Sequence, residues 1–158
     1  MLRFVVQQHF RDAEDWHFDL MLEAGDALVT FSSPVPPDDL ASLPCLVHHL
    51  GDHRLAYLEK EGEISGSRGW CRIHDQGLLE WLEPADPAGR DLADEVRVRL
   101  DGQKARGVYR LAREPASGAD YWRLRHVPEG RTGTLADKPP SPGLRSPGPP
   151  AAPGGKRP

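Results

Sequence analysis

From residue 2 to residue 127 the sequence is a series of short apolar or alternating segments, and turn residues interrupt it at short intervals. Alternation is clearest in VRVRL (96–100) and YWRLRH (121–126), a pattern typical of antiparallel strands that bury one side. Clusters such as EAGD, LGD, DQG and LDGQKARG supply turns between the segments. We therefore predict an all-β fold, built either as a closed barrel or as a sandwich.

Ten segments have the composition of strands, and one has that of a helical turn. The expected strands are 2–7, 17–23, 27–33, 45–50, 53–59, 68–75, 77–83, 96–102, 107–113 and 120–127. The expected helical turn is PDDLASL, residues 37–43, at the end of a proline-rich stretch. Residues 1–127 thus form the predicted domain, which is long enough for one hydrophobic core.

The last segment of the chain has a different composition. Residues 128–158 contain nine of the sixteen prolines, with Gly and Ser between them. Few apolar side chains are present to offset the entropy lost on ordering. We predict that residues 128–158 are a disordered tail.

The net charge of −4 is unevenly distributed along the chain. Residues 128–158 hold five Lys and Arg against two Asp and Glu, a net +3, which leaves −7 on residues 1–127. Because phosphate affinity depends on Lys and Arg, an acidic body binds nucleic acid only through a local site.

The cysteines and the apolar segments indicate the compartment. The chain has two cysteines without a C-x-x-C pair, and it has no apolar run near about 20 residues. Both features are typical of a cytoplasmic protein without membrane contact. We expect a monomer in the cytoplasm.

The segment HFDLMLE (17–23) carries the first candidate for chemistry. In a strand, His17, Asp19 and Met21 project to one side and the apolar residues between them to the other. His9 stands at the end of the first strand, so a return through FRDAEDW brings His17 beside it. Two imidazoles and one carboxylate make a facial metal set with open positions. Alternatively, His9 ends a loop and His17–Asp19 is a hydrogen-bonded core pair.

A second candidate is DHRLAY, residues 52–57. His53 and Tyr57 are four residues apart, so on a strand they share a side. An imidazole near a phenol suits proton transfer to a leaving oxygen and a hydrogen bond to another. Taken alone, a turn histidine and a core tyrosine explain the same residues.

Together, FVVQQH (4–9), HFDLMLE, DHRLAYLEKEGEISGSRGWCRIHDQG (52–77) and GVYRLAREPASGADYWRLRHV (107–127) resemble the 3′-phosphoesterase domain of bacterial DNA ligase D and its stand-alone relatives. The resemblance implies a small antiparallel β-barrel with an open, crescent-like site face and one divalent metal, usually manganese, with zinc as the alternative. It implies trimming of nucleic-acid 3′ ends, by removal of a terminal ribonucleoside and then of the 3′-phosphate.

Carried over by position, the resemblance makes His9, His17 and Asp19 the metal ligands. His53 becomes the histidine at the leaving group, and Tyr57 and Gln7 complete the pocket. An end-joining ligase or polymerase is the partner that the resemblance implies.

Three positions depart from the family pattern. The family has arginine where this chain has Met21, lysine at Val35 and a second arginine near Cys45. Each lost charge-assisted phosphate contact is expected to weaken binding by about 1.5–3 kcal/mol. His9 and His17 are also eight residues apart, where the family usually has six, and a longer hairpin loop accommodates the difference.

Three hypotheses follow for the function. The first is a divalent-metal-dependent 3′-phosphoesterase that processes ends during DNA repair, which we favour. The second is a metal-binding module with little turnover that recruits end-joining partners. The third is a metal-free core in which the histidines are neutral and hydrogen-bonded. A structural metal site would not need His53 and Tyr57, so these two residues favour the enzyme.

Overall fold

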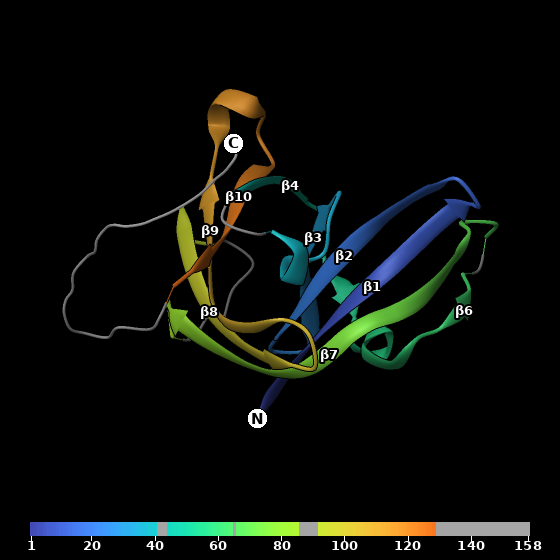
Figure 1. Ribbon diagram of the computed structural model, residues 1–158, viewed down its shortest axis with the longest axis horizontal. Helices are drawn as coiled ribbons and strands as arrows, with labels where there is room; N and C mark the ends of the chain where they lie inside the picture. The colour runs from blue at the N-terminus through green and yellow to red at the C-terminus, as the bar shows by residue number, and fades with distance from the viewer. Residues whose placement is uncertain (41–43, 65, 86–91, 129–158) are drawn as a thin grey trace, which may run out of the picture. The chain divides into compact units, whose positions relative to one another are not determined.

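A single antiparallel sheet curves until its strands close on themselves. The computed structural model describes residues 1–40, 44–64, 66–85 and 92–128. The closed ring contains, in order, β1 (Leu2–Asp12), β2 (Asp15–Ala24), β3 (Ala27–Ser33), β4 (Cys45–His49), β10 (Tyr121–Val127), β9 (Arg106–Arg113), β8 (Glu95–Gly102) and β7 (Trp70–Glu83), which pairs with β1 (Figure 1). Within the described ranges these eight strands form a closed barrel, so the all-β prediction is confirmed and the barrel replaces the sandwich.

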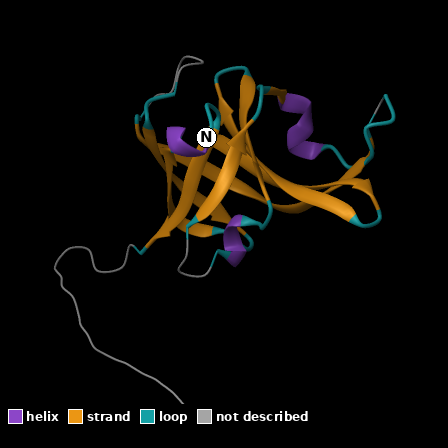
Figure 2. Cartoon of the chain, turned by 90° about the horizontal axis from the view of Figure 1, so that it is seen from above, coloured by secondary structure: helices purple, strands orange, loops and turns teal. Residues whose placement is uncertain are grey.

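Short elements lie outside this ring. β5 (His53–Arg54) pairs with β3, and β6 (Gly62–Glu63) pairs with β7. Three 3₁₀ turns, η1 (Pro37–Asp39), η2 (Leu55–Glu59) and η3 (Pro115–Ser117), lie at the margins of the strands in the described part of the chain (Figure 2). None of the helical segments described here has the length and apolar character that a bilayer crossing requires.

Three predicted strands differ in the structure. The prediction of a strand over 53–59 is wrong beyond Arg54, because η2 follows and its end is fixed by hydrogen bonds from the side chain of Gln7. The segments 68–75 and 77–83 are not separated by a turn at DQG but belong to one strand, β7. Gly77 allows this continuity, since a Cβ there would lie 2.1 Å from the Asp101 carbonyl of β8.

The predicted helical turn 37–43 is described only in part. Residues 37–39 form η1, and residues 41–43 lie outside the described residues.

The alternation of β1 and β2 separates two apolar clusters. The larger cluster fills the barrel, with side chains from all eight ring strands, among them Phe4, Leu20 and Trp122. The smaller cluster lies on the opposite side of the β1–β2 wall, where Val5 and Met21 pack with the η2 region. Residues of β1 and β2 in register with Val5 and Met21 therefore project from the outer side of the barrel, toward η2.

Candidate metal centre

The pairing register of β1 and β2 brings the predicted ligands together. His9 pairs directly with His17, and Gln7 pairs with Asp19. Opposed residues of antiparallel strands project to the same side, so all four side chains share the outer side of the wall. The sequence prediction that His9, His17 and Asp19 converge is thus supported by the backbone register itself.

The distances are those of a potential ligand set. His17 Nε2 lies 3.0 Å from Asp19 Oδ1, and His9 Nδ1 lies 3.6 Å from Asp19 Oδ2. One ligand atom from each residue can be chosen so that all three lie within 4.8 Å of one another. The two imidazole rings meet edge to face, with centroids 4.8 Å apart.

The hydrogen bonds of this cluster leave room for a cation. Asp19 is 4% exposed, and its Oδ1 accepts no hydrogen bond from any described residue, despite the nearby His17 nitrogen. His9 Nε2 is 2.9 Å from the Arg68 carbonyl, which can only accept, so this nitrogen carries the proton. The lone pair of His9 Nδ1 is therefore directed to the Asp19 side. A divalent cation bound by Nδ1 of His9, Nε2 of His17 and the Asp19 carboxylate would satisfy the buried oxygen.

The cluster is electrostatically coupled. Contact with the Asp19 carboxylate raises the pKa of His9, against the opposing effect of burial. Burial would raise the pKa of Asp19, but the imidazoles of His17 and His9 outweigh it and hold that pKa below its ordinary value. Asp19 is thus ionised at neutral pH, which is the state that binds metal, and a cation must compete with the proton of His9.

A small cavity of about 60 Å³ opens beside these ligands. Five of the six predicted site residues line it, and His17 adjoins it through Asp19. The lining residues are Gln7, His9, Asp19, Met21, His53, Tyr57, Ile64 and Arg68.

His53 and Tyr57 meet at the cavity, although not on a common strand as predicted. His53 is the first residue of β5, while Tyr57 lies in η2, and their ring centroids are 5.3 Å apart with the rings nearly perpendicular. His53 Nδ1 lies 3.0 Å from the Gly51 carbonyl, so it donates that hydrogen bond. His53 Nε2 is left as the nitrogen that can exchange a proton with a ligand in the cavity.

Gln7 has a positioning role in this arrangement. Its amide nitrogen donates to the carbonyls of Tyr57, at 2.7 Å, and Lys60, at 3.0 Å. Both amide hydrogens are therefore engaged with the backbone around η2. Gln7 fixes the segment that carries Tyr57.

The three positions without the family's cations have different surroundings. Met21 is 1% exposed and forms part of the cavity wall next to Asp19. Val35 and Cys45 pack against the cluster inside the barrel. Neither of these two side chains lines the cavity.

The loop before β7 supplies a contact that we did not predict. The Arg68 carbonyl orients His9, and Arg68 is also among the residues that line the cavity. Gly69 follows with φ +90, and a Cβ there would lie 1.9 Å from the Phe10 carbonyl, so glycine is required where this loop meets β1. The glycines of GSRG were the available signal, but their role depends on a contact with a distant strand.

Comparison with known proteins gives a consistent result. Residues 7–113 match the family described as the DNA Ligase D 3′-phosphoesterase domain. The chain is 34% identical over 122 residues to the multifunctional non-homologous end joining DNA repair protein LigD of Mycobacterium tuberculosis, an alignment that covers 75% of this chain and 15% of that protein. It is 33% identical over 116 residues to LigD of Mycolicibacterium smegmatis (69% of this chain, 15% of the relative), and 29% identical over 139 residues to LigD of Pseudomonas aeruginosa (85% and 16%).

The match therefore spans about a sixth of the length of these relatives, and it includes the strands that carry the cavity. Gln7, His9, His17, Asp19, His53 and Tyr57 all fall within the matched residues. This chain belongs to the DNA ligase D 3′-phosphoesterase domain family.

Proposed function

We propose that this protein is a divalent-metal-dependent phosphoesterase that processes nucleic-acid 3′ ends in non-homologous end joining. The observation that carries the proposal is the His9–His17–Asp19 cluster, with its buried and unsatisfied carboxylate oxygen, in the wall of a cavity that also contains His53 and Tyr57. When bound, manganese (or zinc) would supply Lewis acidity toward a phosphoryl oxygen and lower the pKa of a water.

The side chains of the cavity have distinct roles in this proposal. The oxygen of a water adds to phosphorus while that water gives up a proton to the solvent, and the bond between phosphorus and the departing oxygen breaks. His53 Nε2 delivers a proton to that oxygen, while its Nδ1 stays anchored on the Gly51 carbonyl. The Tyr57 hydroxyl donates a hydrogen bond to a non-bridging phosphoryl oxygen. Gln7 holds η2 so that Tyr57 faces the cavity.

The substrates are 3′ termini that end in a ribonucleoside or a phosphate. The relatives are named for several functions in end joining, and the match covers about a sixth of their length. We infer that a ligase or polymerase acting on the same ends is the functional partner of this chain. The protein acts as a monomer in the cytoplasm.

One observation favours a second function, a metal-binding module with weak turnover. Met21 places an apolar, uncharged side chain in the cavity next to Asp19. A neutral side chain at this position stabilises a phosphate dianion less than a cation there would, although Arg68 also lines the cavity. Phosphomonoester hydrolysis should therefore be weaker than removal of the ribonucleoside.

Incubation with manganese and a primer–template that ends in one ribonucleotide, or in a 3′-phosphate, tests the proposal. Shortened or dephosphorylated primers should form, and His17→Ala should reduce the rate by more than about 100-fold, since even partners of metal ligands contribute 10–100-fold. The matched control is His126→Ala on β10, outside the cavity, which should keep the wild-type rate. Absence of product with excess wild-type enzyme, although manganese binds, would leave only the binding module.

A further inference from the structure

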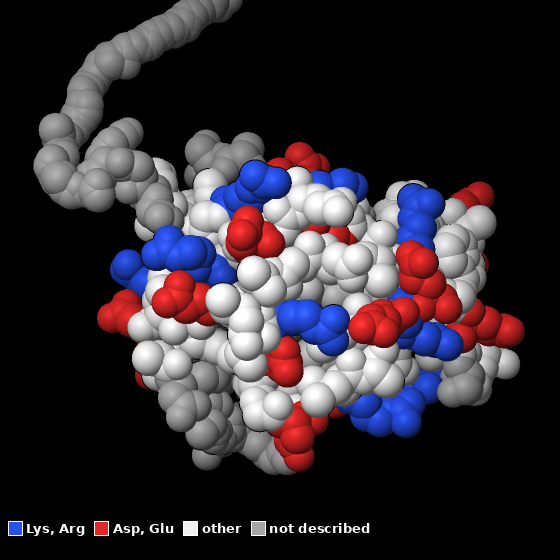
Figure 3. Space-filling model, turned by 90° about the horizontal axis from the view of Figure 1, so that it is seen from below, with Lys and Arg blue, Asp and Glu red and all other residues white. Residues whose placement is uncertain are grey.

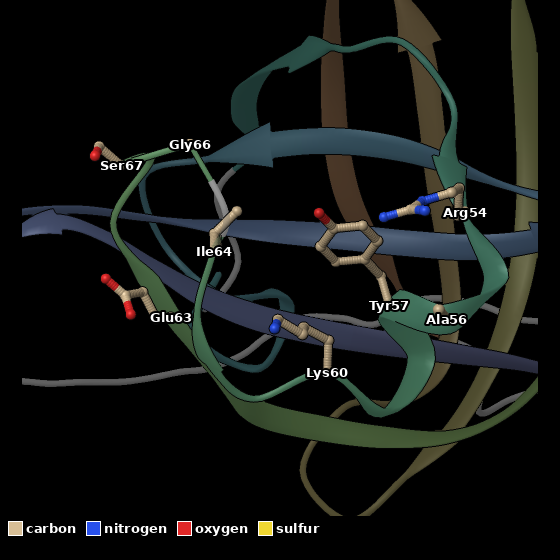
Figure 4. Close-up of a pocket in the computed structure, with 8 residues that line it drawn as sticks. All are labelled: Arg54, Ala56, Tyr57, Lys60, Glu63, Ile64, Gly66 and Ser67. Atoms are coloured by element: carbon tan, nitrogen blue, oxygen red, sulfur yellow. The ribbon is translucent and has the colours of Figure 1, made fainter.

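A second and wider groove, of about 680 Å³, adjoins the metal cavity. The two share Tyr57 and Ile64 in their walls. The groove is lined by Arg54, Ala56, Tyr57, Lys60, Glu63, Ile64, Gly66 and Ser67 (Figure 4). A ligand that reaches the cavity past Tyr57 therefore also lies along this groove.

Two cations flank the point where groove and cavity meet. Figure 4 shows Arg54 and Lys60 on two sides of the Tyr57 ring, with Glu63 farther along the groove. The backbone at each cation is fixed, since Arg54 pairs with Ala27 of β3 and the Lys60 carbonyl accepts from Gln7. The backbone positions of both residues are therefore defined, and Arg54 is exposed while Lys60 is half-buried.

The cations at this end of the groove differ in their surroundings from the other basic side chains described below. On the face shown in Figure 3, acidic and basic side chains alternate without a continuous basic surface. Three of the four arginines that line a hollow on β9 and β10 are compensated, since Arg110, Arg113 and Arg123 lie 2.8, 3.1 and 2.6 Å from carboxylate oxygens. Charges held by nearby carboxylates attract phosphate less than charges beside an open groove.

We propose that Arg54 and Lys60 bind the phosphate that precedes the reacting 3′ terminus, so that the groove holds the backbone of a nucleic-acid strand. The inference rests on the proposed function and adds the two side chains that hold the strand next to its reacting end. Because Glu63 repels phosphate at the far end, the bound phosphate lies at the Arg54–Lys60 end. A nucleoside 3′-monophosphate has no second phosphate to place there and is a poor substrate.

Binding of a fluorescent twelve-nucleotide single strand with a 3′-hydroxyl tests this directly, because that end is not hydrolysed. The full chain and the variants Arg54→Gln, Lys60→Gln and their double are compared by anisotropy over a range of salt concentrations. The slope of log Kd against log salt should fall by about 0.7 for each cation removed. Arg125→Gln on β10, which lines the other hollow, is the matched control and should leave the slope unchanged. An unchanged slope in the double variant overturns the inference, as does a loss confined to Arg125→Gln.

Kinetics separates this inference from the proposed function. On a strand with a 3′-phosphate, the double variant should raise KM by about 100-fold or more, because it removes two charge-assisted contacts that are each worth about tenfold. A nucleoside 3′-monophosphate should show a much smaller change. Salt slopes that fall as expected without any turnover by wild type reject the phosphoesterase and retain the strand site. Turnover by wild type with the same KM in the double variant rejects the strand site and retains the phosphoesterase.

Discussion

A single buried carboxylate, that of Asp75 in β7, organises the turn between β8 and β9. Asp75 is 3% exposed. Its Oδ1 accepts from the backbone N–H groups of Gln76 and Gln103, both at 2.9 Å, and its Oδ2 accepts from Lys104 at 3.1 Å and Ala105 at 2.7 Å. One buried side chain thus satisfies three backbone donors of the turn and one of β7.

Replacing this carboxylate by an amide is expected to destabilise the protein. In Asp75→Asn one acceptor becomes an NH₂ group, which leaves two of these backbone N–H groups without that acceptor, so the free energy of unfolding should fall by about 2–4 kcal/mol. Denaturant unfolding followed by tryptophan fluorescence measures the change. Asp101→Asn, an exposed aspartate at the end of β8, is the matched control and should change stability by less than about 0.5 kcal/mol. Equal stabilities of the two variants would show that Asp75 does not hold the turn.

The sequence did not reveal this role. HDQG has the composition of a turn, and we predicted the end of a strand there. In the structure His74 is an extra residue at a register shift between β7 and β1, which directs Asp75 to the same side as Val6. Three of the donors that Asp75 binds are 28–30 residues away, so no local pattern predicts them.

At the scale of elements, η2 is the part of the site that depends most on a single anchor. The segment packs Leu58 into the outer cluster and carries Tyr57, but its backbone is held to β1 by the Gln7 amide. Gln7 is 1% exposed, so both of its hydrogen bonds are shielded from water. We therefore expect η2 to open as a local unit when the amide is removed.

Gln7→Leu tests this coupling. The variant leaves two backbone carbonyls without their donor, and the local opening free energy of residues 55–60 should fall by about 1–3 kcal/mol. Native-state hydrogen exchange reads this as faster exchange of the amides in that segment, with the barrel amides unchanged. The control is Gln8→Leu, the next residue on β1, whose side chain contacts Arg72 instead. Identical exchange of η2 in wild type and Gln7→Leu would contradict the anchoring role.

The incorrect prediction of a strand over 53–59 shows that local sequence patterns do not include hydrogen bonds from distant side chains. HRLAYLE has strand-forming residues, but Gln7 captures the carbonyls of Tyr57 and Lys60, and these hydrogen bonds fix a 3₁₀ turn. Tertiary contacts outweigh local propensity there. The predicted contact between the rings of His53 and Tyr57 nevertheless forms, because η2 also places Tyr57 at the cavity that His53 lines.

At the scale of the whole molecule, the sequence predicted well which side chains share a side of each strand. Alternation along the strand predicted that His17 and Asp19 share a side, and the expected hairpin placed His9 beside them. The observed register adds Gln7, which only the family resemblance had indicated. The location of the groove could not be predicted. It depends on how β5, η2 and the loop before β7 lie against that wall, which no alternation encodes. Arg54 and Lys60 are six residues apart around η2, and only the fold gives them a common neighbour in Tyr57.

The division of the chain at residue 127 is the last sequence prediction, and it concerns the stability of the whole domain. The barrel ends with β10, whose final pair is Val127 with Val108 of β9. A chain that stops at Pro128 keeps every strand of the ring, and it loses only a segment too poor in apolar side chains to stabilise a fold. Its free energy of unfolding should match that of the full chain within about 0.5 kcal/mol, as measured by denaturant titration.

A chain that stops at Arg123 provides the matched comparison. It loses Leu124, which is 0% exposed inside the barrel, together with the β10–β9 pairs from Leu124 to Val127. Loss of one buried leucine alone is expected to cost about 2–5 kcal/mol, so this chain should unfold at much lower denaturant or fail to fold. The two truncations differ by five residues but fall on opposite sides of the last closing pairs of the barrel. If stopping at Pro128 lowers stability as much as stopping at Arg123, residues beyond 128 belong to the folded unit and the predicted boundary is wrong.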